Sequence, residues 1–229
     1  MAKKRKNSNY VTEKTERRRL EEEKLLKRKK IKKTMLISLA VFLAVAVLVL
    51  AVLGLCYVSG AFDYHPEATH HAEIEILNYG TLHVALYGND APETVNKFLE
   101  LVDSGDYVGL TLFQILGDSI YGGTTYAGIS AGIRGEFSDN GVNNKVSHTR
   151  GTISMARGED YNSAYSQFFI VREDSPEFDG KYAAFARITS GMDIIDHIFE
   201  SVHTYDDGKI PLGEQPAIKK IEIHSASAH

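Results

Sequence analysis

A stretch without any charged side chain, from residue 35 to residue 58, most constrains what this chain can fold into. It reads MLISLAVFLAVAVLVLAVLGLCYV, and Ser38 is its one clearly polar side chain. As an α-helix, such a stretch extends over about 36 Å, which is longer than the hydrocarbon core of a membrane at about 30 Å. We therefore expect residues 35–58 to form one transmembrane helix.

Two other interpretations of this stretch are weaker. A helix buried in a soluble core would need a much larger domain around it, because it is apolar on every side. A cleaved signal peptide would have a shorter apolar region and a cleavage pattern of small residues, which the sequence from Cys56 to Ser59 lacks. A membrane anchor remains the best interpretation.

Charge is distributed unevenly about the apolar stretch. Residues 1–34 carry 15 Lys or Arg and 5 Glu, a net charge of +10, while residues 59–229 carry 11 Lys or Arg and 25 Asp or Glu, a net charge of −14. Basic residues beside a membrane span favour the cytoplasmic side. We expect a single-pass protein of the cell membrane, with a cytoplasmic N-terminus and an extracellular C-terminal domain.

The basic tail, residues 1–34, favours lipid over nucleic acid as its partner. Six basic residues lie between Lys27 and Lys33, directly before the span, where they can attract anionic lipid headgroups. Five glutamates are interleaved with the basic residues, and Glu13 precedes Arg17 by four positions, a spacing that suits a solvated helix. We expect a partly helical tail and no nucleic-acid partner.

The rest of the chain divides into a linker and one domain. Residues 59–71 mix Gly, Pro and polar residues, as linkers do. His70 and His71 have no third ligand at a metal-binding spacing, so we expect no metal site.

Residues 72–226, about 155 residues, are enough for one compact domain. The single cysteine, Cys56, lies in the apolar stretch, so this domain has no disulfide.

Short strands dominate the predicted secondary structure of the domain. Apolar residues alternate with period two from Ile74 to Ile76 and from Leu82 to Leu86, with a turn at Gly80, which predicts a hairpin. Further strands are expected at residues 110–116, 151–157, 166–172, 183–188 and 218–224. Many strands without βαβ alternation favour an antiparallel barrel over a doubly wound sheet.

Two helices are expected beside these strands. Asp90 is a candidate N-cap, and Pro92 lies near the first turn of a segment with apolar residues at helical spacing. Gly105 is expected to end this helix. A second short helix is predicted at about residues 192–200.

Several motifs of the domain resemble one family. Residues 149–156 read TRGTISMA, and SQFFI, DGKYAAF and SGMDIID follow in order. With these motifs the segment from Ala72 to His224 resembles the cyclophilin family of peptidyl-prolyl cis-trans isomerases. The resemblance implies a mostly β fold, an eight-stranded antiparallel barrel with a helix at each end and a substrate groove on its outer wall. It also implies isomerisation of X-Pro bonds in proline-containing polypeptides, without a cofactor.

The resemblance further implies which residues line the groove. Gln167 and Phe169 fall in SQFFI, and an amide beside aromatic rings on one sheet face would suit a small apolar ring. The positions that match substrate-binding residues of the family are Phe113, Tyr121, Met155, Ala156, Arg157, Gln167, Phe169, Phe178 and Tyr182.

The sequence departs from the family pattern at the catalytic arginine. The interval between Gly109 and Gly122 is one residue shorter than usual, so that Gln114 takes the arginine position when the alignment starts from the left, and Phe113 when it starts from the right. We take Gln114 as the candidate catalytic residue. Asp118 stands where an apolar residue of the proline pocket is expected, and a charge in such a pocket resists desolvation.

Two functions therefore stay open. The first is a monomeric membrane-anchored isomerase that assists the folding of exported proteins, with weakened catalysis. Exchanging a charged donor for a neutral one costs on the order of 1 to 2 kcal/mol, or about five- to thirtyfold in rate. The alternative is a catalytically inactive module that binds proline peptides or acts as a tethered scaffold.

Overall fold

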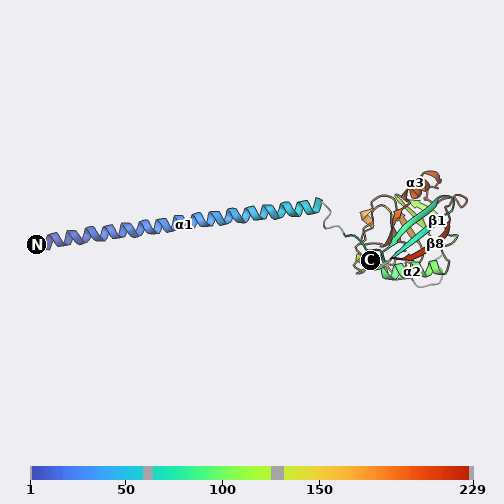
Figure 1. The fold of residues 1–229 in the computed structure, drawn as a ribbon, viewed down its shortest axis with the longest axis horizontal. Coiled ribbons are helices and arrows are strands. Elements are labelled where there is room, and N and C mark those ends of the chain that lie inside the picture. The colour runs from blue at the N-terminus through green and yellow to red at the C-terminus, as the bar shows by residue number, and fades with distance from the viewer. Residues whose placement is uncertain (1, 59–63, 125–131, 227–229) are drawn as a thin grey trace. The chain divides into compact units, whose positions relative to one another are not determined.

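The structure is a computed structural model of the chain, and it describes residues 2–58, 64–124 and 132–226. The chain divides into two units, Met1–Asp63 and Tyr64–His229. The first unit consists of one long helix, α1 (Ala2–Val58). The second unit contains the strands and the remaining helices (Figure 1).

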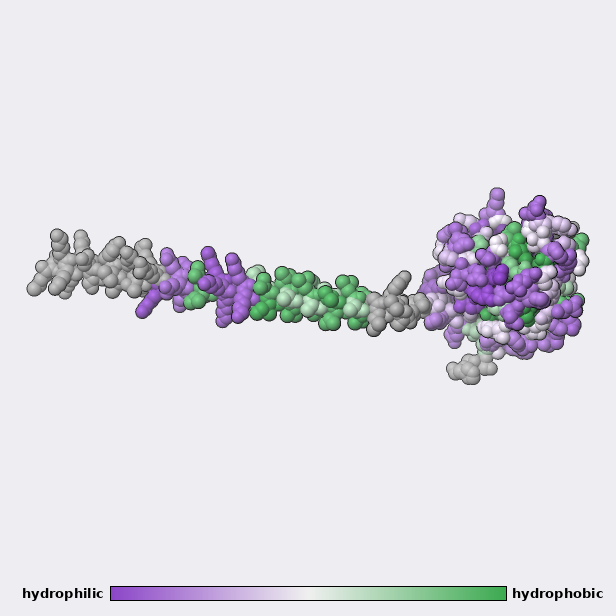
Figure 2. All heavy atoms as spheres, turned by 90° about the horizontal axis from the view of Figure 1, so that it is seen from above, coloured by the Kyte–Doolittle hydropathy of each residue, from purple (hydrophilic) through white to green (hydrophobic). Residues whose placement is uncertain are grey.

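α1 includes the whole apolar stretch predicted to span a membrane. Figure 2 shows a charged segment of this helix followed by an apolar one. Within this unit, nearly all side chains from residue 19 to residue 53 are exposed. The segment Arg19–Leu53 is long and apolar enough to cross a membrane.

The second unit is built on one antiparallel sheet of eight strands. The strands follow the order β3-β4-β6-β5-β7-β2-β1-β8 across the sheet. Their bounds are β1 (His70–Ile76), β2 (Gly80–Leu86), β3 (Leu112–Leu116), β4 (Ser119–Gly122), β5 (Thr152–Met155), β6 (Phe168–Val171), β7 (Ala183–Ser190) and β8 (Ile218–Ser225).

Hydrogen bonds join the two edges of this sheet. The Ile218 amide donates to the Leu110 carbonyl oxygen at 2.8 Å, and the Gly109 amide donates to the Ile218 carbonyl oxygen, also at 2.8 Å. The Leu112 amide donates to the Pro216 carbonyl oxygen at 2.9 Å. β3 therefore meets the chain before β8, and the sheet curls round. The predicted eight-stranded barrel is confirmed.

Two helices lie at opposite ends of the barrel, as predicted (Figure 1). They are α2 (Pro92–Asp103) and α3 (Met192–Ser201). Two short 3-10 turns, η1 (Ser138–Asn140) and η2 (Pro176–Phe178), lie between them in the chain. The buried faces of both helices join one core with the inward side chains of the strands. Helix side chains in this core include Val95, Phe98, Leu101, Ile195 and Ile198.

β4 is the strand that the sequence pattern missed. It contains only four residues, SIYG, which is too short for a visible alternation. Gly117 and Asp118 form the two-residue turn before it, because Leu116 pairs directly with Ser119. A Gly-Asp pair between apolar segments is a recognised hairpin signal, so this strand was detectable.

Candidate functional site

A row of paired residues crosses four strands on the outer wall of the barrel. Gln114 on β3 pairs with Tyr121 on β4, and Tyr121 pairs with Phe169 on β6. Phe169 in turn pairs with Ser154 on β5. Paired residues of neighbouring strands point to the same face of a sheet, so the four side chains share the outer face. Their neighbour Phe168 points inward, where it joins the main core.

The β3 to β4 pairing shows where the two candidate residues of the short hairpin, Phe113 and Gln114, lie. The register shifts between Leu112 and Gln114, because Phe113 is an extra residue in a β-bulge. Gln114 thus occupies a regular position opposite Tyr121, in line with Phe169. The row with Tyr121 and Phe169 therefore contains Gln114, and Gln114 as the catalytic residue stays a prediction.

Phe169 lies at the centre of an aromatic cluster formed with Tyr121, Phe178 and Tyr182. The ring centroids of these three residues lie 5.3, 5.3 and 5.2 Å from the Phe169 centroid. Phe169 itself is 0% exposed. The apolar hollow expected at this ring is thus filled by side chains of the protein. Tyr121 is half-buried and lies tilted against Phe169, with an angle of 30° between the rings.

A buried hydrogen-bond network lies next to this cluster and holds one of its neighbours, His148, in place. His148 stacks on Phe169 with ring centroids 6.1 Å apart and an angle of 9° between the rings. Its Nδ1 lies 2.7 Å from an Asp179 carboxylate oxygen, and its Nε2 lies 2.7 Å from the Ser154 hydroxyl. Since a carboxylate only accepts, Nδ1 carries the proton and the Ser154 hydroxyl donates to Nε2.

This network resembles a Ser-His-Asp triad only in its distances. Ser154 is 0% exposed, so no substrate can reach its hydroxyl. The network instead fixes the His148 ring, and with it the position of Phe169. Sequence spacing gave no sign of it, because Ser154, His148 and Asp179 come from separate segments.

Burial also controls the protonation of His148. Burial lowers the pKa of His148, and the Asp179 carboxylate opposes this effect without overcoming it. The unfolded chain therefore binds a proton at a higher pH than the folded chain does. The neutral His148 ring therefore contributes fully to the free energy of unfolding above the unfolded pKa of about 6.5. Below that pH the contribution is lost, at no more than about 1.4 kcal/mol per pH unit.

We expect an NMR titration of the full chain to show this directly. The His148 ring should become protonated at a lower pH than histidine in an unfolded peptide, and the free energy of unfolding should fall between pH 7 and pH 5. A His148→Gln variant, which is less stable at every pH, should lose part of this pH dependence. Protonation of His148 at or above pH 6.5 would contradict the assignment.

Arg157 is held rigidly beside the aromatic cluster. Its Nε donates to the Lys181 carbonyl oxygen at 3.0 Å, and one Nη donates to the Gly158 carbonyl oxygen at 2.9 Å. Its guanidinium carbon lies 4.7 Å from the centroid of the Tyr161 ring and 5.0 Å from that of Tyr182. These contacts fix the loop after β5 rather than leave the cation free for a substrate.

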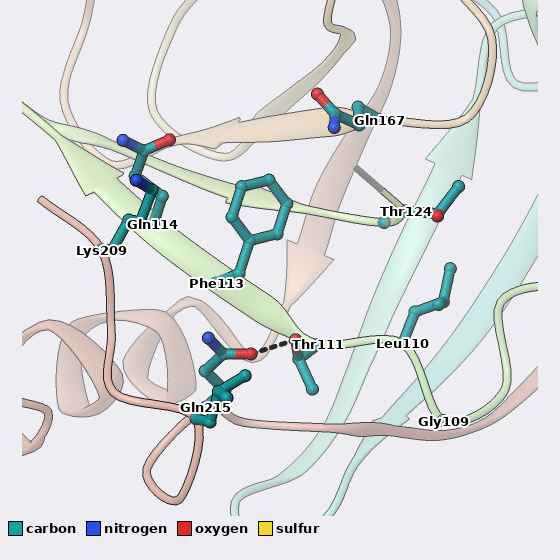
Figure 3. Close-up of a pocket in the computed structure, with 11 residues that line it drawn as sticks. Gly109, Leu110, Thr111, Phe113, Gln114, Thr124, Gln167, Lys209 and Gln215 are labelled. Carbon is teal, nitrogen blue, oxygen red and sulfur yellow. Dashed lines mark hydrogen bonds between the residues drawn. The ribbon is translucent and has the colours of Figure 1, made fainter. Parts of the chain in front are cut away.

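Two hollows lie on the outer wall, on either side of Gln167. The larger hollow has a volume of about 520 Å³, and the smaller hollow has about 100 Å³. Both are lined by Gln167 and Thr124. The larger hollow also includes Phe113 and Gln114, and Figure 3 shows the Phe113 ring between Gln114 and Gln167. The smaller hollow is lined in addition by Ala156 and Arg157.

The amides of the two glutamines differ in their hydrogen bonding. Gln114 donates from Nε2 to the Asp207 carbonyl oxygen at 2.8 Å. The side chain of Gln167 is half-buried and has no hydrogen-bond partner among the residues that the structure describes. A half-buried amide without a partner is costly unless a ligand or water completes its bonds. The Gln167 amide is therefore available to a ligand or to water.

The structure corrects two expectations about the groove. Met155 is 1% exposed and lies in the main core opposite Phe168, because side chains alternate along β5 and Ser154 takes the outward position. Met155 therefore packs the barrel and does not face the groove. Asp118 is exposed at the β3 to β4 turn, so its charge is not buried in an apolar pocket.

Other residues of the larger hollow were not predicted. Lys209, Leu212 and Gln215 come from the loop before β8, and Thr111 donates a 2.6 Å hydrogen bond to Gln215 there (Figure 3). No motif marks these residues, because their approach to β3 depends on how the two sheet edges meet.

Comparisons with known proteins agree with this architecture. Residues 71–228 match the family model described as cyclophilin type peptidyl-prolyl cis-trans isomerase/CLD. The chain is 35% identical over 130 residues to peptidyl-prolyl cis-trans isomerase B of Escherichia coli, which covers 53% of this chain and 79% of that protein. It is 30% identical over 178 residues to peptidyl-prolyl cis-trans isomerase CYP23 of Arabidopsis thaliana, which covers 71% of this chain and 74% of that protein.

A solved structure shows the same fold. The crystal structure of a cyclophilin type peptidyl-prolyl cis-trans isomerase of Cryptosporidium parvum, in the presence of the dipeptide Ala-Pro, superposes with a TM-score of 0.58 and 27% sequence identity. The match covers 68% of this chain and 99% of that one. The family model alone matches more than half of the chain. This chain belongs to the cyclophilin-type peptidyl-prolyl cis-trans isomerase family.

Proposed function

We propose that this protein is a membrane-anchored isomerase that acts slowly on X-Pro bonds of exported polypeptides. The observation that carries the proposal is the Gln167 amide, which lies between two hollows on the outer wall and lacks a partner among the described residues. The backbone of an extended peptide offers a carbonyl oxygen and an N–H group, and the Gln167 side-chain amide can donate to the first and accept from the second. Gln167 thus holds the substrate backbone while the X-Pro bond rotates.

The chemistry requires positioning rather than covalent catalysis. Rotation about a peptide bond meets a barrier of about 18 to 20 kcal/mol, because it breaks amide resonance. As conjugation is lost, the prolyl nitrogen regains a lone pair, and a hydrogen-bond donor aimed at it stabilises the transition state. Gln114 provides only a neutral donor, and its amide is already bonded to Asp207. With Gln114 as its main donor, the site would turn over slowly for this reason.

The proline ring binds against the aromatic cluster in this proposal. Tyr121 covers Phe169, but the Tyr121 hydroxyl has no hydrogen-bond partner within the described part of the chain, and only ring contacts hold the side chain. A rotation of Tyr121 frees the face of Phe169 between Phe178, Tyr182 and Ala156. The Ala-Pro dipeptide present with the related Cryptosporidium parvum protein supports a site of this size.

The proposed location of the barrel rests on the apolar stretch and the basic tail of the sequence. Residues 35–58 cross the membrane, and the basic residues from Lys27 to Lys33 stay at the cytoplasmic face, where they attract anionic headgroups at about 1 kcal/mol each. The barrel then lies outside the cell as a monomer. Uncatalysed prolyl isomerisation takes about 10 to 100 s at 25 °C, which delays the folding of newly exported chains. Proline-containing segments of such chains are the proposed substrates.

One experiment tests location and activity together. External protease on intact cells is expected to cut near residues 59–71 and release the folded barrel. The released barrel should accelerate isomerisation of a short Xaa-Pro peptide, measured by NMR exchange. In Gln167→Ala the acceleration should fall about tenfold, since one or two neutral hydrogen bonds are lost. Glu177→Gln, an exposed exchange outside both hollows, is the matched control and should leave the rate unchanged.

The outcomes separate the parts of the proposal. If the protease releases nothing, the barrel is not outside. If it releases a folded barrel that does not accelerate isomerisation, the protein is not an isomerase. The covered face of Phe169 favours one alternative, a module that binds or scaffolds without turnover. Peptide binding that depends on Gln167, without acceleration, would identify that alternative.

A further inference from the structure

The loop before β8 lies along β3 almost as an additional strand. The Ile115 amide donates to the Gly208 carbonyl oxygen at 2.8 Å, and the Ile210 amide donates to the Phe113 carbonyl oxygen at 2.8 Å. Between these bonds, Gln114 forms an antiparallel bridge with Lys209. The loop backbone is therefore fixed against the strand that carries the candidate catalytic residue.

Gly208 makes this close approach possible. Its φ of +78° is one that residues with side chains rarely adopt, and a Cβ there would collide with the Ile115 carbonyl oxygen. The Gln114 amide adds a third bond by donating to the Asp207 carbonyl oxygen. Lys209 is thus held at one defined place across from Gln114.

The side chain of Lys209 is exposed although its backbone is fixed. It is 62% exposed, and within the described part of the chain its ammonium forms one ion pair, with an Asp207 carboxylate oxygen at 2.6 Å. An exposed ion pair of this kind contributes little to stability, so the ammonium can leave Asp207 at a small cost in free energy. Lys209 also lines the larger hollow with Phe113, Gln114 and Gln167 (Figure 3).

The lining of the two hollows includes one other cation. Arg157 lines the smaller hollow, but backbone carbonyl oxygens and aromatic rings hold its guanidinium in place. Among the described lining residues, only Lys209 combines a positive charge with freedom to move. A lysine ammonium on a flexible stem can follow a substrate as it rotates.

We propose that Lys209 supplies the positive charge of the isomerisation site, in place of the arginine that β3 lacks. This inference rests on the proposed isomerase function. Its ammonium leaves Asp207 and donates a hydrogen bond toward the X-Pro amide as that amide loses conjugation. No covalent bond forms or breaks, and the proton stays on the lysine. Gln114 then orients the loop through Asp207 instead of acting as the main donor.

The test compares Lys209 variants of the full chain in detergent micelles. Lys209→Met should lower kcat/KM for a neutral Xaa-Pro peptide about tenfold, mainly through kcat, because a charged donor is lost. Lys209→Arg should restore most of the rate. Lys219→Met is the matched control, because Lys219 forms a similar exposed ion pair with Glu75 on another face, and it should leave the rate unchanged.

Two further measurements separate a role of the Lys209 charge in the reaction from a purely structural role: the dependence of the rate on salt, and the effect of Asp207→Asn. Added salt should slow the native protein but not Lys209→Met. Asp207→Asn, which frees the ammonium, should keep the rate or raise it a few-fold. A Lys209→Met protein as fast as the native one would overturn this inference and leave the proposed function intact. An Asp207→Asn loss as large as that of Lys209→Met would overturn it too, whereas an inactive native protein would end both proposals.

Discussion

Replacing Phe169 by alanine is expected to lower the free energy of unfolding by about 3 to 5 kcal/mol, among the largest effects of a single substitution here. Phe169 is 0% exposed and contacts Tyr121, Phe178, Tyr182 and the His148 ring. Removing its ring leaves a cavity in the middle of the cluster and takes away the contacts with all four neighbouring rings. The midpoint of thermal unfolding should fall by roughly 10 °C, measured on the full chain by near-ultraviolet circular dichroism of the tyrosines.

Tyr121 provides the comparison for this variant. Tyr121→Gln removes a half-buried ring whose hydroxyl lacks a partner among the described residues, so the cost should be much smaller than for Phe169→Ala. It should also raise isomerase activity, because it uncovers the face of Phe169. Equal losses of stability in the two variants would contradict the view that Phe169 is the centre of the cluster and Tyr121 its cover. A loss of activity in Tyr121→Gln would show that Tyr121 itself contacts the substrate.

The fold was predictable because its signals are local. Period-two alternation from Ile74 to Leu86 predicted β1 and β2, and apolar residues at helical spacing after Pro92 predicted α2. Each of these signals depends on neighbouring residues alone. β4 was missed because four residues carry too little pattern, and its place becomes clear only from its pairing with β3 and β6.

The candidate site was predictable only in part, because it depends on contacts between distant segments. Alternation along β6 sends Phe168 into the main core and Phe169 into the outer aromatic cluster, which a strand pattern implies from two adjacent positions. The same rule applied to β5 would have placed Met155 inward once Ser154 was known to pair with Phe169. Lys209 lies 95 positions from Gln114 along the chain, and no spacing rule connects them before the barrel closes.

The N-terminus of α2 shows the same dependence on distant segments. Asp90 was expected to cap this helix, but the N-cap is Ala91, which has no side-chain cap, and the Asp90 carboxylate accepts from the Tyr64 hydroxyl at 2.8 Å. Glu136 caps the helix instead. Its carboxylate accepts from the Glu93 amide at 2.9 Å and from the Thr94 amide and hydroxyl at 2.8 and 2.7 Å.

Glu136→Ala is therefore expected to cost about 3 to 4 kcal/mol of stability. Glu136 is 3% exposed, so its removal leaves two buried donors of Thr94 and a partly buried amide of Glu93 without an acceptor. It also removes a negative charge from the positive end of the helix dipole. The change should lower the unfolding midpoint by about 10 °C in the measurement used for Phe169. Hydrogen exchange should accelerate first at the Thr94 amide.

Glu93→Gln is the matched control for this prediction. Glu93 is an exposed acid in the first turn of the same helix, so its exchange should cost no more than about 1 kcal/mol. Isomerase activity of folded Glu136→Ala should stay close to that of the native protein, because α2 lines neither hollow. If Glu136→Ala and Glu93→Gln destabilise the barrel equally, the dipole alone accounts for the effect, and the three hydrogen bonds of Glu136 contribute nothing measurable.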